Sequence, residues 1–227
     1  MKQFIAFFIL VCIFLPACAV APAATPLEQL TIQYSVAGIP WLPTLFRCSN
    51  GNAIDAEQRG TDFLDIKNAD MVIRLGKPDI PSAYVYQLGT DELLVITNSK
   101  NPARQLTPEQ VYKLFTGQIQ DWSSLNGNTA AVQVWIFANG EDITELFKQY
   151  SLRGSPVSSA AHLANNPQEM VQAIEKDINA IGIITRRLLS NENVTVANTV
   201  ASNLPMLGIS STKPNRSLAH LITCMQK

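Results

Sequence analysis

Three segments of the sequence combine hydroxyl, glycine and basic residues in a way that suits the binding of a small anion. They span residues 35–39, 74–78 and 139–144. Ser35 and Thr144 carry hydroxyl groups, and Arg74 carries a planar fork of N–H donors that matches an oxyanion. Each residue also has a plainer reading, since Ser35 could close a turn and Arg74 could pair with a surface carboxylate. These segments nevertheless predict the donors of a ligand site.

Glycines and one amide complete the predicted site. Gly38 and Gly140 would let a ligand approach the backbone N–H groups, and Asn139 opens the third segment. The predicted ligand-binding residues are therefore Ser35, Gly38, Arg74, Asn139, Gly140 and Thr144.

Catalysis has little support in the sequence. His162 and His220 are the only histidines, and neither has a nearby nucleophile or metal-ligand pattern, so each is expected on a helix surface or in packing. Neither a phosphate-cradling loop nor a dinucleotide glycine fingerprint is present. We therefore expect no catalytic residue, no metal, no cofactor and no enzyme activity.

Strands and helices alternate along the chain, which predicts an α/β fold with mainly parallel sheets. Expected strands cover residues 31–36, 69–73, 83–88, 93–97, 132–137, 180–185 and 204–211. Expected helices cover residues 41–46, 143–150, 166–178 and 215–225, and residues 48–60 are expected to be a loop leading into a short helix. A further helix begins after Thr107, because Thr107 and Gln110 have the spacing of a capping box and Pro108 suits the first helical position. Parallel strands place their carboxyl ends at one edge, where the candidate loops would meet.

One long stretch of the sequence resembles a known family. The residues that carry the resemblance are Asn101-Pro102, Leu106-Thr107, Leu114-Phe115-Thr116-Gly117, Ile119 and Asp121-Trp122. They resemble the signature of phosphate-type solute-binding proteins of ABC importers, and Ala180-Ile181-Gly182 resembles a second segment of that family. The resemblance covers residues from about 69 to the C-terminus well and residues 27–68 only loosely.

The resemblance implies a two-lobe type II periplasmic-binding-protein-like fold. Each lobe would be a mainly parallel sheet flanked by helices, and two crossing strands would join the lobes. Lobe one would comprise residues 27–97 plus 204–227, and lobe two residues 98–203. The implied function is binding of a small ligand, such as an oxyanion, between the lobes of a monomer that delivers it to an ABC permease. An extracytoplasmic interaction or sensor module with no transport role is the alternative.

The third candidate segment departs from this family at Glu141 and Asp142. The family places hydroxyl and backbone donors there, whereas two carboxylates would repel a bound dianion strongly in a cleft of low dielectric constant. Phosphate is therefore in doubt. A neutral or cationic ligand, a monoanion held by the opposite lobe, and no ligand at all are the alternatives.

The first 26 residues have the features of a signal peptide followed by a tether, which predicts export. Lys2 precedes an apolar run over residues 4–15 that is of signal-peptide length and too short for a membrane span. The run ends in Leu15-Pro16-Ala17-Cys18, which resembles a bacterial lipoprotein box, so residues 1–17 would be the signal peptide and Cys18 the lipidated residue. Residues 18–26 would be a tether to the membrane. Ordinary cleavage near residues 19–21 is the alternative, and either route predicts export.

The mature chain would retain Cys48 and Cys224 besides Cys18. An exported pair can form a disulfide between the two ends of the chain, and two separate buried thiols are the alternative. The full sequence has 17 basic and 18 acidic residues among 227, so it has no basic surplus and nucleic acid is not an expected partner.

Mass spectrometry of the mature N-terminus tests the predicted anchor. We expect a mature protein that starts at Cys18 and carries the added mass of acyl chains. An unmodified start at Val20 or Pro22 would show ordinary cleavage instead and would remove the lipid anchor.

Overall fold

The computed structural model of the protein describes residues 28–76, 83–125, 127–189 and 193–227. The predicted signal peptide, the tether with Cys18, and residues 77–78 of the second candidate segment lie outside the described residues.

Within the described residues, eight strands form one hydrogen-bonded sheet in the order β2-β1-β3-β8-β4-β7-β5-β6. The strands are β1 (Gln29–Tyr34), β2 (Ala53–Gln58), β3 (Met71–Leu75), β4 (Tyr84–Asn98), β5 (Gln133–Phe137), β6 (His162–Ala164), β7 (Ala180–Thr185) and β8 (Val194–Ser210). The helices are α1 (Leu42–Arg47), α2 (Pro108–Phe115), α3 (Asp142–Phe147), α4 (Pro167–Lys176) and α5 (Arg216–Met225). The 3-10 helices η1 (Val36–Trp41), η2 (Thr61–Phe63) and η5 (Arg186–Leu188) follow β1, β2 and β7.

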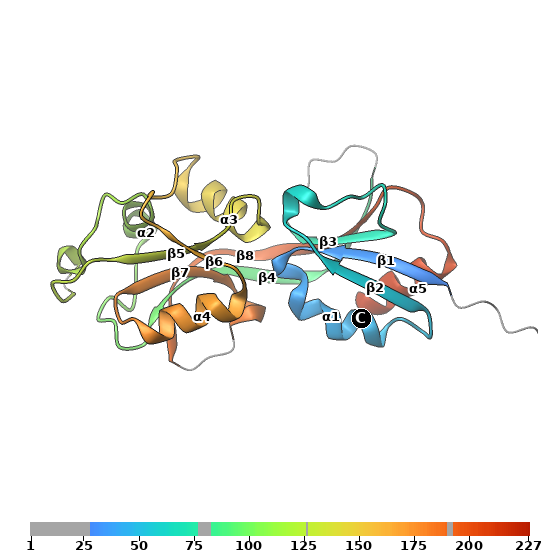
Figure 1. The fold of residues 1–227 in the computed structure, drawn as a ribbon, viewed down its shortest axis with the longest axis horizontal. Helices are drawn as coiled ribbons and strands as arrows, with labels where there is room; N and C mark the ends of the chain where they lie inside the picture. The colour runs from blue at the N-terminus through green and yellow to red at the C-terminus, as the bar shows by residue number, and fades with distance from the viewer. Residues whose placement is uncertain (1–27, 77–82, 126, 190–192) are drawn as a thin grey trace, which may run out of the picture.

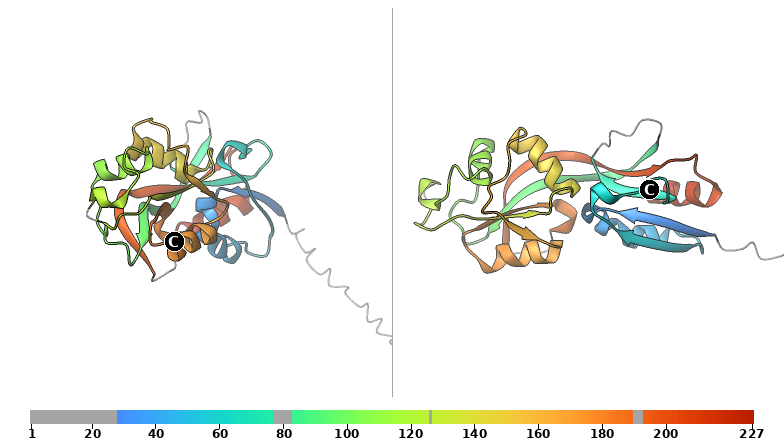
Figure 2. Two further views of the ribbon diagram at one scale, coloured as in Figure 1. Left: turned by 60° about the vertical axis from the view of Figure 1, so that its left-hand side comes forward. Right: turned by 45° about the horizontal axis from the view of Figure 1, so that its top comes forward.

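Two long antiparallel strands, β4 and β8, run from one lobe into the other and connect the two lobes of the molecule (Figures 1 and 2). In lobe one the pair adjoins β3, β1 and β2, with α1 and α5 on one face of the sheet. In lobe two it adjoins β7, β5 and β6, with α3 and α4 on opposite faces. The predicted two-lobe α/β fold is confirmed. The two expected sheets are joined into one set of strands because β4 and β8 pair along both lobes.

The crossing strands are longer than the sequence pattern suggested. Two segments, 83–88 and 93–97, were expected as separate strands, and they form the single strand β4 with register shifts between Gln87 and Ile96. Because Leu93–Thr97 already pair with β7, β4 enters lobe two before residue 98. The predicted lobe boundaries, after residues 97 and 203, fall within these strands and stay a prediction.

The expectation for residues 48–60 was wrong. Instead of a loop and a helix, this segment contains β2, which pairs in parallel with β1 from Gln29↔Ala53 to Tyr34↔Gln58. Strand β2 is exposed or half-buried along its length and lies at the edge of the sheet, so it has no strong apolar pattern to detect.

Helix α2 has the ends that the sequence predicts. The Thr107 hydroxyl accepts a hydrogen bond from the Gln110 backbone N–H at 3.2 Å, and the Gln110 side chain accepts one from the Thr107 N–H at 2.8 Å. Val111, Leu114 and Phe115 are buried, and the Phe115 ring lies 4.5 Å from the Phe147 ring. Helix α2 thus helps to fix the position of α3, which carries Phe147.

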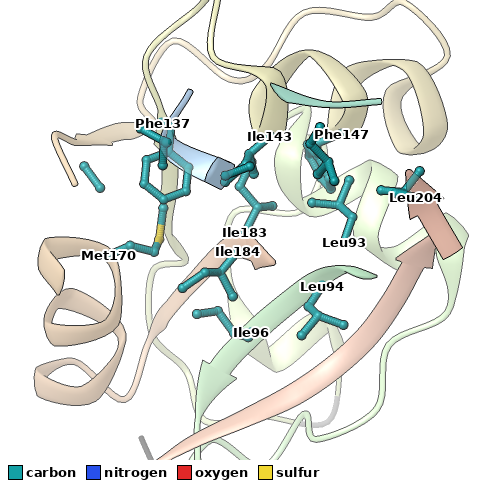
Figure 3. Close-up of a cluster of buried hydrophobic side chains, with 14 of the residues drawn as sticks. Leu93, Leu94, Ile96, Phe137, Ile143, Phe147, Met170, Ile183, Ile184 and Leu204 are labelled. Atoms are coloured by element: carbon teal, nitrogen blue, oxygen red, sulfur yellow. The ribbon is translucent and has the colours of Figure 1, made fainter. Parts of the chain in front are cut away.

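The core of lobe two holds α3 against the sheet. Figure 3 draws Ile143 and Phe147, from α3, in the same cluster as Leu93 of β4 and Ile183 of β7. All four side chains are fully buried. This packing fixes the first turn of α3 and therefore the residue directly before Ile143, which is Asp142.

A disulfide joins Cys48, which follows α1, to Cys224 in α5. The two Cα atoms are 5.7 Å apart, and 176 positions separate the cysteines along the chain. The bond ties together the two helices that cover one face of lobe one, and so links the first and last parts of the described chain.

Reduction of this disulfide should destabilise the protein. Removing a native disulfide typically costs about 2–5 kcal/mol, and a cross-link over a loop this long constrains the unfolded chain strongly. We expect urea denaturation with a reductant to show a loss of unfolding free energy in this range. The double variant C48A/C224A should be insensitive to the reductant, and a non-reducing peptide map with both thiols free would contradict the prediction.

Candidate functional site

The carboxyl ends of β1 and β3 place two hydrogen-bond donors side by side. The strands are parallel neighbours, and the Ser35 backbone N–H donates to the Ile73 carbonyl at 3.0 Å. The Ser35 hydroxyl and the Leu75 backbone N–H therefore lie at the same edge of lobe one. Both residues are fully buried.

A carboxylate from lobe two occupies these donors. Asp142 is the first residue of α3, and its Oδ2 accepts hydrogen bonds from the Ser35 hydroxyl and from the Leu75 N–H at 2.8 Å. Its Oδ1 accepts a third hydrogen bond, from the Ile143 N–H at 2.9 Å. The Asp142 side chain has no exposed surface. One buried carboxylate thus bridges the two lobes.

Neighbouring contacts bring the lobes into close apposition. The Asp142 backbone N–H donates to the Thr61 hydroxyl at 2.9 Å, and Thr61 belongs to η2 of lobe one. Gly140 has φ +83°, and a Cβ there would collide with the Asp62 carboxylate. Gly76 has φ +79°, and a Cβ there would lie 2.9 Å from Leu146. Both glycines are therefore needed for conformation and for space.

Three acidic side chains and one arginine share this region. Arg74 is half-buried, and burial lowers the pKa of its guanidinium while the charges of Asp142 and Asp62 oppose that change. Its Nε atom is buried and has no hydrogen-bond partner among the described residues. Arg74 therefore retains a donor that could serve an oxyanion.

The acidic groups have raised pKa values. Burial and the charges of Asp142 and Asp62 raise the pKa of Glu141 to about 7, and a hydrogen bond from the Val36 N–H partly opposes this. Burial also raises the pKa of Asp142, against the effect of its hydrogen bonds and of Arg74. The two carboxyl groups use different lobe-one donors: Glu141 accepts from the Val36 N–H, and Asp142 accepts from Ser35 and Leu75.

Three of the expected site residues are brought together and three are not. Ser35, Arg74 and Gly140 lie at this contact between the lobes. Three other residues use their polar groups elsewhere: Asn139 is exposed and accepts from Lys148, Thr144 donates to the Phe137 carbonyl at 3.0 Å, and Gly38 N–H donates to the Ser35 carbonyl.

Asp142, Leu75 and Thr61 were missed as site residues. The sequence pattern predicts for Asp142 the repulsion of an anion and not a contact between the lobes. A buried carboxylate must find hydrogen-bond donors, and that requirement is the available signal. The contributions of Leu75 and Thr61 had no signal in the sequence, because one is a backbone group and the other lies outside every segment considered for the site.

The histidines take no part in this site. His162 lies on β6 rather than on a helix, and its ring stacks on Trp135 at 4.8 Å, while His220 is exposed on α5. Among residues 28–76, 83–125, 127–189 and 193–227, no group of three or more metal-ligating side chains could hold a metal ion.

A second space between the lobes is a groove of about 430 Å³. Ile39 and Pro40 of η1 line it from lobe one, and Val171 of α4 and Arg187 of η5 line it from lobe two. The Arg187 guanidinium lies 4.5 Å from the centre of the Trp41 ring. The volume is in the range of small-molecule sites.

Comparison with known proteins identifies the family. A family described as a PBP superfamily domain matches residues 83–226, which is more than half of the chain. The chain belongs to the PBP superfamily. The resemblance expected from the sequence signature is therefore confirmed at the family level.

Solved structures share the PBP fold over most of this chain. A protein from Clostridium perfringens assigned as a phosphate ABC transporter substrate-binding protein, with bound phosphate, has a TM-score of 0.78 at 17% identity over 87% of this chain and 93% of its own. An ABC-type phosphate transport receptor from Vibrio cholerae has a TM-score of 0.68 at 18% identity, with the same coverage of both chains. The reduced OxyR regulatory domain from Pseudomonas aeruginosa has a TM-score of 0.62 at 11% identity over 88% and 98%.

At these identities the likeness establishes the fold of this PBP superfamily member. No curated protein matches the chain. Among the helices that the structure describes, none has the length and apolarity needed to cross a bilayer.

The raised pKa of Glu141 predicts a stability that falls with rising pH. Between its ordinary value of 4.5 and about 7, the folded protein keeps the Glu141 proton and the unfolded chain releases it. Stability is therefore lost as pH rises through this interval. We expect a loss of about 1 kcal/mol, because solvent screens a half-buried carboxyl.

Urea denaturation of wild type and Glu141→Gln at pH 5 and pH 7.5 measures this loss. The variant should lose less stability than the wild type by that amount, since the substituted amide does not titrate. Equal pH dependence in the two proteins would show that Glu141 has an ordinary pKa.

Proposed function

We propose that this PBP superfamily member is an exported solute-binding protein that holds a small ligand between its two lobes. The observation that carries the proposal is the meeting of lobe-one donors, Ser35 and Leu75, with a lobe-two acceptor, Asp142. Donors at strand ends that meet a group from the opposite lobe form a site that opens and closes as β4 and β8 bend. Binding is favoured when the closed state makes contacts that the open state lacks.

The groove beside η1 supplies the room for the ligand in this proposal. Its lining combines apolar residues with Gln168, Gln172, Glu175 and Arg187, and such a mixture suits a small molecule that carries a few polar groups. The carboxylates of Asp62, Glu141 and Asp142 disfavour a dianion next to them. We therefore propose a ligand that is neutral or carries a single charge, and phosphate dianion is disfavoured.

The proposed role in transport is based on proteins of similar structure. Two of the similar structures are described as phosphate transport proteins of ABC systems. By analogy, this protein would be a monomer that passes its ligand to an ABC permease, and lipid on Cys18 would hold it at the membrane. No bond is made or broken in this mechanism, so the protein would not be an enzyme.

A second candidate is an extracytoplasmic interaction or sensor module on the same fold. One specific observation favours it: Asp142 already uses the donors of Ser35 and Leu75, so those two groups are not free for a solute. A regulatory domain, that of OxyR, also shares the fold. In this role the lobes would respond to a partner rather than deliver a solute.

A thermal-shift panel of small oxyanions, amines and neutral metabolites tests the proposed function. A ligand at 100 times its dissociation constant should stabilise the protein by about 2.7 kcal/mol. Arg187→Ala should weaken that effect, because Arg187 lines the groove. Arg186→Ala is the matched control, since Arg186 pairs with Glu92 at 2.8 Å and does not line the groove. No stabilisation by any compound would favour the sensor module.

A further inference from the structure

The Asp142 carboxylate is bound as a ligand would be bound. It is fully buried and accepts three hydrogen bonds, two of them from the opposite lobe. A buried carboxylate without such donors would be strongly destabilising. The lobe-one donors therefore stabilise a group that is carried by lobe two, and their energy favours the closed state.

The same donors would form an oxyanion site if the Asp142 carboxylate were absent. A serine hydroxyl and a backbone N–H converge on one oxygen atom, and the half-buried Arg74 retains an Nε atom without a partner among the described residues. Charge-assisted hydrogen bonds of these kinds are the usual means of binding carboxylate, sulfate or phosphate groups. Asp142 therefore occupies the place of an external oxyanion.

We propose that Asp142 is an intramolecular ligand that holds the two lobes closed and blocks oxyanions from the Ser35–Leu75 donors. The proposal rests on the proposed function, because it assumes that the contact between the lobes is a binding site. Covalent attachment gives the carboxylate a high effective concentration at these donors. A free oxyanion must displace it and must also approach the Asp62 carboxylate and, at pH values above about 7, an ionised Glu141, and these charges repel an anion.

Asp142→Ser tests the proposal by emptying the site. The substitution removes the carboxylate, leaves space next to Ser35 and Leu75, and retains a residue that suits the first turn of a helix. With inorganic phosphate and sulfate as probes, we expect calorimetry to show affinity at least about tenfold higher than for wild type, which corresponds to about 1.4 kcal/mol. Equal affinities of wild type and D142S for both anions would overturn the proposal.

Two control variants distinguish the effect of the space that the Asp142 side chain fills from the effect of its charge. Asp142→Asn removes the charge but fills the same space, so it should gain little affinity, and a gain as large as that of D142S would overturn the proposal. In the double variant S35A/D142S the gain should be lost, because one of the donors is missing. A gain that persists there would place the anion elsewhere and would also overturn the proposal.

A measurement on a conservative variant covers the case in which D142S does not fold. Ser35→Ala removes one of the two inter-lobe hydrogen bonds to the Asp142 carboxylate, so the lobes should separate more often and the Leu75 amide should exchange with solvent faster. Ser155→Ala is the matched control, since Ser155 also loses a side-chain bond, to Tyr112, but lies away from this contact. Unchanged exchange at Leu75 in S35A would overturn the proposal.

The two proposals can fail separately. If wild type binds nothing in the ligand panel while D142S binds phosphate, the transport function fails and the role of Asp142 stands. If wild type binds phosphate and D142S binds it equally well, the role of Asp142 fails and the solute-binding function stands.

Discussion

The hydrogen bonds that join the Asp142 carboxylate to Ser35 and Leu75 are the constraint on which the arrangement of the lobes depends. They are made inside the protein, where the net free energy of a satisfied charge is small but the cost of an unsatisfied one is large. The closed arrangement is therefore maintained less by the strength of these bonds than by the penalty for losing one partner.

The scaffold around this contact explains why it can be made at all. Ile143 and Phe147 fix α3 in the core of lobe two, and parallel pairing fixes the ends of β1 and β3 in lobe one. Gly76 and Gly140 leave the space that lets the two edges touch. Positions set by packing on both sides therefore bring the donors and the acceptor together.

The sequence predicted the fold well because its signals were local. A few adjacent residues are enough to predict the capping box of α2 and the apolar strand β7. Strand β2 was missed because its alternation is short and weak: only Ile54 and Ala56 are half-buried in this edge strand. The candidate site was predicted only in part. Ser35 and Arg74 were expected as hydrogen-bond donors, but Asp142 was expected to repel a bound anion and not to accept hydrogen bonds from lobe one. Its acceptor role depends on a residue 107 positions away, which no local pattern encodes.

The disulfide between Cys48 and Cys224 has a consequence for the order of assembly if the chain is exported as proposed. Lobe two is built mostly from one continuous stretch, whereas lobe one needs the end of β8 and helix α5, which emerge after lobe two from the export machinery. Cys48 would then remain a free thiol until α5, which carries Cys224, has been exported. An oxidant supplied too early would meet Cys48 without its proper partner, so correct maturation depends on when the thiols are oxidised as well as on whether they are.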